Sequence, residues 1–211
     1  MMSKWALALS ASLMGMAFSA QAAGGDVRAS IGGGSFKVEP DYDYDYEADE
    51  VTTFDIRAAF KPTENVFLRG QYLMGSADKL EYAGYDYDTD LDINVLRLGA
   101  GYGGNAGSIR VYGALEYVDI EISVDNDEIG DDGVAFTGGI GDQGAGSWLW
   151  NVELSLIKLQ DSNGASLEAT LGYRFTPMFA LVGGIQSYAF EDDYDAEYSY
   201  GQLHIGGQLS F

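Results

Sequence analysis

The chain has 211 residues, of which 33 are acidic and 11 basic, for a formal net charge of −22. This charge excludes nucleic acid as a partner, because phosphate binding requires an excess of Lys and Arg. The absence of Cys removes disulfides and thiolate metal sites, and no segment reaches the ~20 consecutive apolar residues of a membrane-spanning helix. The 29 Gly and 15 Tyr, against 3 Pro, are typical of a protein built from β-sheet.

The first residues have the form of a secretory signal peptide. Lys4 supplies a positive charge, residues 6–18 are small and apolar, and Ala20-Gln21-Ala22 matches the pattern that a signal peptidase cuts. We therefore expect residues 1–22 to be a signal peptide and residues 23–211 to form one domain.

Alternation of apolar and polar residues predicts ten strands after this segment. Their expected ranges are 26–36, 51–61, 66–77, 90–102, 109–120, 134–142, 148–159, 166–175, 178–190 and 199–211. Each is close to or above the ~9–11 residues that a tilted strand needs to cross a bilayer. Merging the weaker strands would give eight, which is the alternative. In the range 90–102 the apolar face changes phase around Val95 and Leu96, which we interpret as a β-bulge or a misplaced boundary.

One face of these strands suits lipid. In the range 166–175, Leu167, Leu171 and Phe175 share one face, and Glu168 and Arg174 share the other. The connections alternate between long acidic segments (37–50, 78–89, 121–133 and 191–198) and short turns, except that the connection after residue 159 is short. A soluble β-sandwich would also alternate, but the signal peptide, this rhythm and the aromatic strand ends favour lipid. The sequence predicts an all-β fold, a transmembrane antiparallel up-and-down β-barrel.

The last residues carry the most specific local pattern. Leu203, Ile205, Leu209 and Phe211 lie on one face of the last predicted strand. Here the chain resembles the small bacterial outer-membrane β-barrel proteins of the OmpA/OmpX-like kind, in the porin-like barrel superfamily, whose last strand ends in Phe preceded by apolar residues at alternate positions. The resemblance implies a place in the cell outer membrane, among lipid and lipopolysaccharide, and we expect a monomer, although the sequence does not determine the oligomeric state. The resemblance also implies that these four residues are an assembly signal for the barrel-assembly machinery.

Charged residues within the predicted strands are expected to point into the barrel. A guanidinium that faces lipid near the bilayer centre costs roughly 2–4 kcal/mol, so the interior is its favourable place. The expected ion-pair network of the lumen consists of Arg28, Asp55, Arg57, Arg69, Arg97, Arg110, Glu116, Glu153, Glu168, Arg174 and His204. Such pairs either hold a narrow lumen shut or leave a thin wet path. We favour a narrow or blocked lumen, because eight to ten strands leave room for little more than side chains.

The four long segments contain 22 acidic residues and two Lys, a net charge of −20. Asp and Tyr alternate in them, and their carboxylates are candidates for binding divalent cations beside lipopolysaccharide phosphates. The candidate ligands are Asp41, Asp43, Asp45, Asp86, Asp88, Asp125, Asp127, Asp192, Asp193 and Asp195. Residues 125–130 begin like a calcium loop, but Ile129 and Phe136 stand where oxygen ligands are required, so we expect no EF-hand. Solvated loops and a protein-binding surface are the other interpretations, and no other cofactor or metal is expected.

Two roles are open for such a barrel. The first is a structural or surface-interaction role, carried by acidic extracellular loops around a closed lumen. The alternative is a small cation-preferring, porin-like channel, because an acidic rim concentrates cations. Enzymes of this architecture use a His with Asp or Ser partners, whereas the one histidine here, His204, has Gln202 and Gly206 as its same-face neighbours. We therefore expect no catalytic residues and no enzyme.

Overall fold

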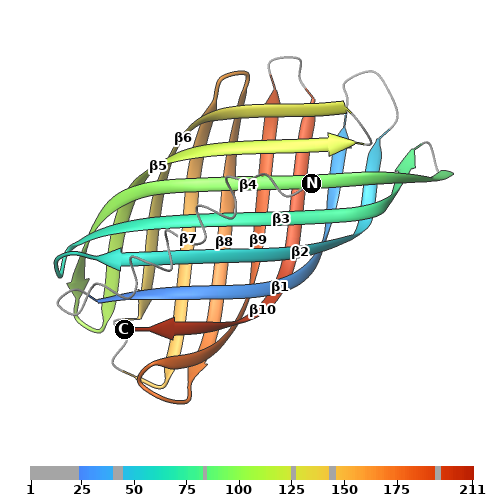
Figure 1. Cartoon of the computed structure of the whole chain (residues 1–211). Helices are drawn as coiled ribbons and strands as arrows, with labels where there is room; N and C mark the ends of the chain where they lie inside the picture. The colour runs from blue at the N-terminus through green and yellow to red at the C-terminus, as the bar shows by residue number, and fades with distance from the viewer. Residues whose placement is uncertain (1–23, 40–44, 83–84, 125–126, 143–145, 193–195) are drawn as a thin grey trace.

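The computed structural model describes residues 24–39, 45–82, 85–124, 127–142, 146–192 and 196–211. These residues form ten strands that close into one barrel (Figure 1). The strands are β1 (Gly24–Glu39), β2 (Tyr46–Lys61), β3 (Val66–Tyr82), β4 (Tyr85–Ala106), β5 (Ile109–Val124), β6 (Asp127–Asp142), β7 (Trp148–Leu159), β8 (Ser162–Arg174), β9 (Phe179–Asp192) and β10 (Glu197–Ser210). The predicted ten-stranded all-β barrel is confirmed, and the eight-stranded alternative is wrong.

Each strand pairs antiparallel with its neighbours in sequence, and β1 closes the barrel against β10. With an even number of antiparallel strands, β1 begins and β10 ends at the same end of the barrel. We call this the turn end, because residues 62–65, 107–108 and 175–178 connect strands there. The opposite end is the hairpin end, which lies toward the upper right of Figure 1. Within the described residues, no helix has the length and apolar character needed to cross a membrane.

The strands run further into the acidic segments than the sequence predicted. β3 ends at Tyr82 and β4 begins at Tyr85, so most of the expected loop 78–89 is paired strand. Most of the described residues of 37–50, 121–133 and 191–198 likewise continue the strands toward the hairpin end. Cross-strand pairs explain the difference, because Lys79 lies opposite Asp88 and the rings of Tyr46 and Tyr82 stack with centroids 4.6 Å apart. The prediction of four long loops is therefore wrong for the described residues of these segments, most of which continue the strands.

The apolar face of the strands changes sides along the barrel. In β4, Leu91, Ile93 and Val95 point inward and are buried, whereas Leu98 and Tyr102, nearer the turn end, point outward and are exposed. The ladders of β4 with β3 and β5 run through Val95 and Leu96 without a shift in register, so the predicted bulge or misplaced boundary at that point is wrong. The change of phase has another cause. Toward the turn end the outer face is apolar, and toward the hairpin end the inner face is apolar.

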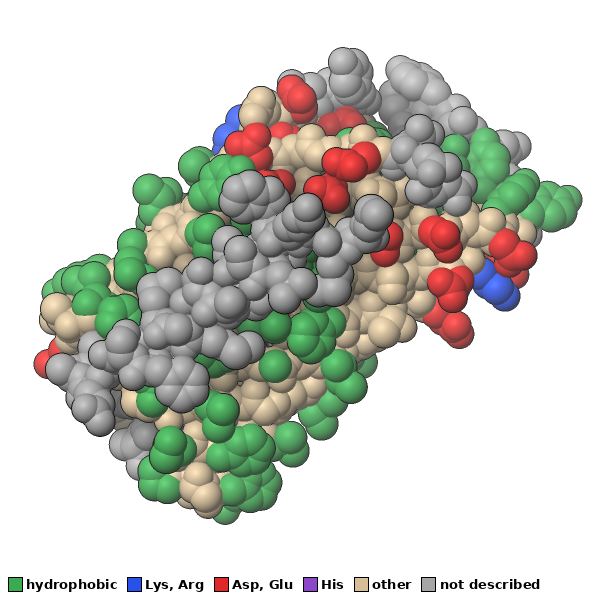
Figure 2. Space-filling view, in the orientation of Figure 1, with side chains coloured by type: hydrophobic (Ala, Val, Ile, Leu, Met, Phe, Trp, Pro, Cys, Tyr) green, Lys and Arg blue, Asp and Glu red, His purple; other side chains and the backbone are tan. Residues whose placement is uncertain are grey.

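The inward-facing apolar residues form one cluster, which we call the inner core. It consists of Phe36, Ala48, Val51, Leu73, Ala77, Leu91, Ile93, Val95, Val118, Ile120, Ala135, Ile157, Leu159, Tyr188 and Tyr200. On the outer surface the large exposed hydrophobic residues of the strands lie mostly nearer the turn end. Figure 2 shows this division, with acidic side chains gathered toward the hairpin end and hydrophobic ones toward the turn end. The hairpin end is therefore built like a water-soluble barrel, and the rest of the barrel has its apolar surface outside.

Candidate functional site

Charged side chains cross the lumen just below the inner core, on its turn-end side. In β1, β2 and β8, Arg28 and Arg57 both bind Glu168, Arg28 at 2.7 Å, and Arg57 also lies 2.8 Å from Asp55. The strand order places β9 and β10 between β8 and β1, so Glu168 reaches these arginines across the bore. The four side chains are at most 12% exposed. They therefore fill part of the lumen as one connected group.

A second group spans β3, β4, β5 and β7. Arg97 binds Glu116 at 2.6 Å, and Arg69 binds Glu153 at 2.7 Å and Glu116 at 3.3 Å. Since β4, β5 and β6 separate β3 from β7 in the sheet, the Arg69–Glu153 pair also crosses the bore. We call the eight residues of both groups the ion layer. Paired in this way, charges that are expensive to bury alone become tolerable in the interior.

Neutral hydroxyl groups complete the second group. Arg97 donates hydrogen bonds to Thr137 at 2.9 Å, Ser155 at 2.8 Å and Ser166 at 3.3 Å, from β6, β7 and β8. The site predicted from the sequence contained none of these three residues, because it was limited to Arg, Asp, Glu and His side chains. They lie on the polar face of their strands, and that position is the signal that could have found them.

Three predicted members of the network lie apart from these ion pairs. The guanidinium of Arg110 lies 5.8 Å from the ring centre of Phe67, and Arg174 donates to the backbone carbonyl of Gly146. His204 is 6% exposed, and neither ring nitrogen has a hydrogen-bond partner among the described residues. The expected network thus comes together at eight of its eleven positions.

The predicted cation ligands are described only in part. Asp41, Asp43, Asp125, Asp193 and Asp195 lie outside the described residues, as does the side chain of Asp127. Asp86 and Asp88 are exposed in β4, and Asp45 lies 2.9 Å from Lys37. Asp192 lies 3.0 Å from the hydroxyl group of Tyr198. In the described part of the chain, no three acidic or histidine side chains are grouped to hold a metal ion.

Charge crowding perturbs several groups at the hairpin end. Hydrogen bonds to Glu39 and Asp45 raise the pKa of Lys37. Partial burial, together with the nearby Glu128 and Asp119, raises the pKa of Glu121. Both raised pKa values indicate a surface with crowded carboxylates, which repel one another and attract cations.

The seam between the first and last strands is closed by Phe211. Its backbone exchanges hydrogen bonds of 2.9 and 3.0 Å with Gly25. Leu203, Ile205 and Leu209 point outward beside it and are at least 55% exposed, so the predicted assembly signal is one outward apolar row.

Comparison with known proteins agrees with this architecture. The model of a family described as outer membrane protein beta-barrel domain matches residues 5–211. The chain belongs to this family. Its place is accordingly the outer membrane, as predicted. In outer-membrane barrels the short turns are periplasmic, so the turn end faces the periplasm and the hairpin end faces outward.

Solved structures of outer-membrane proteins are similar in fold. Neisserial surface protein A is 13% identical, with a TM-score of 0.48, over 89% of this chain and 97% of that one. OprG from Pseudomonas aeruginosa is 11% identical, with a TM-score of 0.46, over 90% and 96%. The transport unit of the autotransporter AIDA-I from Escherichia coli is 9% identical, with a TM-score of 0.50, over 95% and 96%. At these identities the likeness is one of fold alone. No curated protein matches the chain.

Proposed function

We propose that this outer-membrane barrel is sealed, that its working surface is the acidic hairpin end, and that it carries out no catalysis. The observation that carries this proposal is the inner core, which lies across the bore directly outside the ion layer. Along β4, β5 and β7 the inner face passes from Arg97 to Val95, from Glu116 to Val118 and from Ser155 to Ile157. A solute would have to cross a layer of paired charges and then a layer of packed hydrocarbon.

The acidic hairpin end is the surface that then meets the surroundings. Glu81 lies opposite Asp86 in the β3–β4 hairpin, and Asp86 and Asp88 are exposed. Carboxylates at this height stand beside lipopolysaccharide phosphates, and divalent cations are the ions that can bridge two such anionic surfaces. We therefore propose that the hairpin end contacts lipopolysaccharide through divalent cations, with the protein acting as a monomer.

Support for a non-enzymatic role comes from His204. Its imidazole is buried in the wall of the barrel, and it does not line the cavity that opens at the turn end. An imidazole that acts as a general base needs a partner to orient it and access to a substrate.

The surface role is tested by the Mg²⁺ dependence of stability in bilayers that contain lipopolysaccharide. We expect Mg²⁺ to raise the temperature at which the folded band disappears in a heat-modifiability gel. A variant with Glu81→Gln, Asp86→Asn and Asp88→Asn should lose most of this increase, because it has lost three carboxylates of one hairpin. The control, Glu64→Gln, removes an exposed carboxylate at the turn end and should respond like the wild type. An equal Mg²⁺ response in the triple variant, or none in the wild type, would contradict the proposal.

A further inference from the structure

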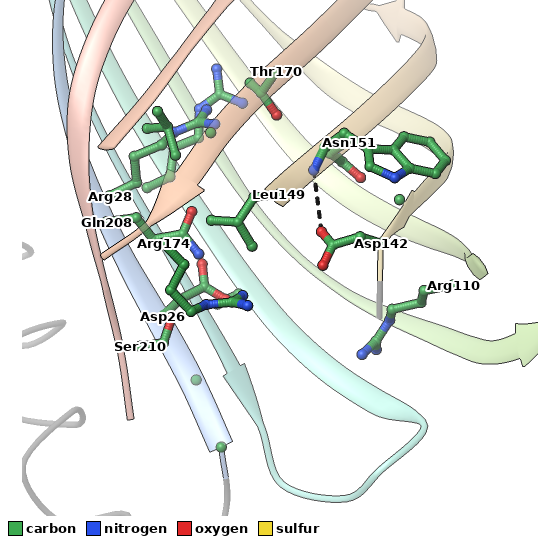
Figure 3. A pocket seen from close by; sticks show the side chains of 18 of the residues that line it. Asp26, Arg28, Arg110, Asp142, Leu149, Asn151, Thr170, Arg174, Gln208 and Ser210 are labelled. Carbon is green, nitrogen blue, oxygen red and sulfur yellow. Dashed lines mark hydrogen bonds between the residues drawn. The ribbon is translucent and has the colours of Figure 1, made fainter. Parts of the chain in front are cut away.

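A cavity of about 870 Å³ opens at the turn end of the barrel (Figure 3). Its lining runs from Gly24 and Phe211 at the mouth to Arg57, Glu153 and Glu168 of the ion layer. The ion layer therefore forms the floor, and the space is a cup that opens only toward the periplasm. Its volume lies in the range of small-molecule sites, roughly 300–1,000 Å³.

The charge of this cup is opposite to that of the rest of the protein. Six of the chain's eleven basic residues line it, against four of its 33 acidic residues. The basic residues are Arg28, Arg57, Lys61, Arg69, Arg110 and Arg174, and the acidic ones are Asp26, Asp142, Glu153 and Glu168. Two of these acids, Glu153 and Glu168, are already paired with arginines of the floor. The cup thus has an excess of positive charge in a strongly acidic chain.

Two of the basic residues are available to an incoming anion. Neither Arg110 nor Lys61 forms an ion pair with a described residue. Asp26, which also lines the cup, interacts electrostatically with both. In Figure 3, Arg110 lies on one side of the cavity and Asp26 on the other. An anion between these walls would gain from Arg110 and Lys61 and would be opposed by Asp26 and by Asp142, which also lines the cup.

One wall of the cup is apolar and held in place. The ring of Phe67 lies edge-on to that of Tyr112, with centroids 5.7 Å apart, and Arg110 lies over Phe67. The hydroxyl group of Tyr112 is within hydrogen-bond distance of Glu153 and Asn151, at 2.6 and 2.8 Å. The end of the Phe67 ring lies against Gly101, where a Cβ would come within 2.2 Å of it. Phe67 is 6% exposed and Tyr112 is partly exposed, so the accessible aromatic surface of this wall is mainly that of Tyr112.

We propose that the cup binds small organic anions that carry one phosphate, sulfate or carboxylate group on an aromatic or similarly flat apolar body. The anionic group would lie between Arg110 and Lys61, where a guanidinium can donate two parallel hydrogen bonds to it. The apolar body would pack on Tyr112 and the accessible edge of Phe67. Because the inner core and the ion layer close the far end, such a ligand enters and leaves from the periplasm and is bound, not conducted.

The probe for this site is phenyl phosphate, measured by equilibrium dialysis against the folded barrel in nanodiscs of zwitterionic lipid at low salt. We expect saturable binding of one probe per barrel, weakened by added salt because the attraction is electrostatic. Arg110→Met and Lys61→Met should each weaken binding about tenfold, and Asp26→Asn should tighten it. Lys158→Met, which removes an exposed basic residue on the outer surface, is the matched control and should bind like the wild type. Benzyl alcohol, a neutral analogue, should show no saturable binding.

Each arm of the experiment can overturn the proposal. Absence of saturable binding to the wild type would do so, as would equal affinity in Arg110→Met and Lys61→Met, or equal binding of benzyl alcohol. An equal loss of affinity in Lys158→Met would show that binding of phenyl phosphate depends on the net charge of the protein and not on the residues of the cup. Folding of every variant is checked by heat-modifiable gel migration. If Arg110→Met fails to fold, Lys61→Met and Asp26→Asn still give opposite expected changes.

Discussion

Arg97 lies at the boundary between the ion layer and the inner core, where it is 3% exposed and binds Glu116 at 2.6 Å. Its other partners are hydroxyl groups from β6, β7 and β8, so one side chain ties four strands other than its own. A buried carboxylate that loses its partner is left with an uncompensated charge in a medium that solvates it poorly. The free energy of unfolding of the barrel therefore depends more on whether each buried charge has a partner than on the number of buried charges.

The first prediction concerns this pairing. Arg97→Met should lower the free energy of unfolding by about 3–5 kcal/mol, because Glu116 loses its shortest ion pair. The double variant Arg97→Met/Glu116→Gln should recover part of the loss, because the buried carboxylate that lost its shortest ion pair is then neutral. Urea unfolding in lipid vesicles, followed by tryptophan fluorescence, measures both. A double variant that is less stable than the single one would contradict this account of the layer.

A second prediction concerns the seam at Gly25. A Cβ at this position would lie 2.7 Å from both the carbonyl oxygen of Ala59 and the ring of Phe211. Gly25→Val should therefore lower the stability of the closed barrel by about 1–3 kcal/mol. Gly33→Val is the matched control, because the nearest atom to a Cβ there is 4.0 Å away. The heat-modifiable gel shift should move to lower temperature in the first variant only, and equal shifts in both would argue against a role for this contact.

The third prediction concerns pH at the hairpin end. The raised pKa of Glu121 means that the folded state binds its proton more tightly than the unfolded state does. This contribution to stability is present below the unfolded pKa and is lost as the pH rises through the folded pKa. Glu121→Gln should therefore stabilise the protein at pH 7, by roughly 0.2–1 kcal/mol, and have little effect near pH 4. Thermal unfolding at the two pH values is the measurement, and an equal gain at both would contradict the assignment.

At the scale of the element, several strands are apolar on the outer face toward the turn end and on the inner face toward the hairpin end. β5 turns Leu115 and Tyr117 outward and, nearer the hairpin end, Val118 and Ile120 inward. The point of exchange marks where the strand leaves the bilayer, because an apolar outer face is stable only in lipid and an apolar inner face is stable in either setting.

Much of this could be predicted from the sequence, and what could not has a physical reason. The strand number and antiparallel order follow from alternation and turn residues, which are local signals. The inner core was missed because a period of two does not say which face is inside, so the phase change at Val95 was interpreted as a defect. The ion pairs of Glu168 with Arg28 and Arg57 join distant strands. Their residue types could be predicted, but the pairing depends on the closure of the barrel.

The fourth prediction tests where β4 leaves the bilayer. A single tryptophan is placed at Leu98 or at Asp92, both outward-facing, in a background with Trp5→Phe, Trp148→Phe and Trp150→Phe. Lipids with brominated acyl chains should quench the tryptophan at 98 strongly and the one at 92 weakly. Equal quenching at both positions would mean that the inner core lies within the bilayer and not outside it.

At the scale of the whole molecule, the barrel consists of three successive layers along its axis. The periplasmic cup carries an excess of positive charge, the ion layer crosses the bore, and the inner core lies beneath the acidic hairpins. Each layer contacts the next one along the barrel axis. The inner core covers the ion layer on the side toward the hairpin end, whereas the cup leaves its other side open to the periplasm. Val38, Leu80 and Ile122 of the hairpin end pack against the same core.

Conductance of the refolded protein in a planar bilayer, under a salt gradient, tests the sealed barrel most directly. We predict no steady conductance steps from protein shown to be folded by heat-modifiable gel migration, because no continuous wet path crosses the ion layer and the inner core. Steady cation-selective steps would contradict the account and would establish the channel alternative in its place.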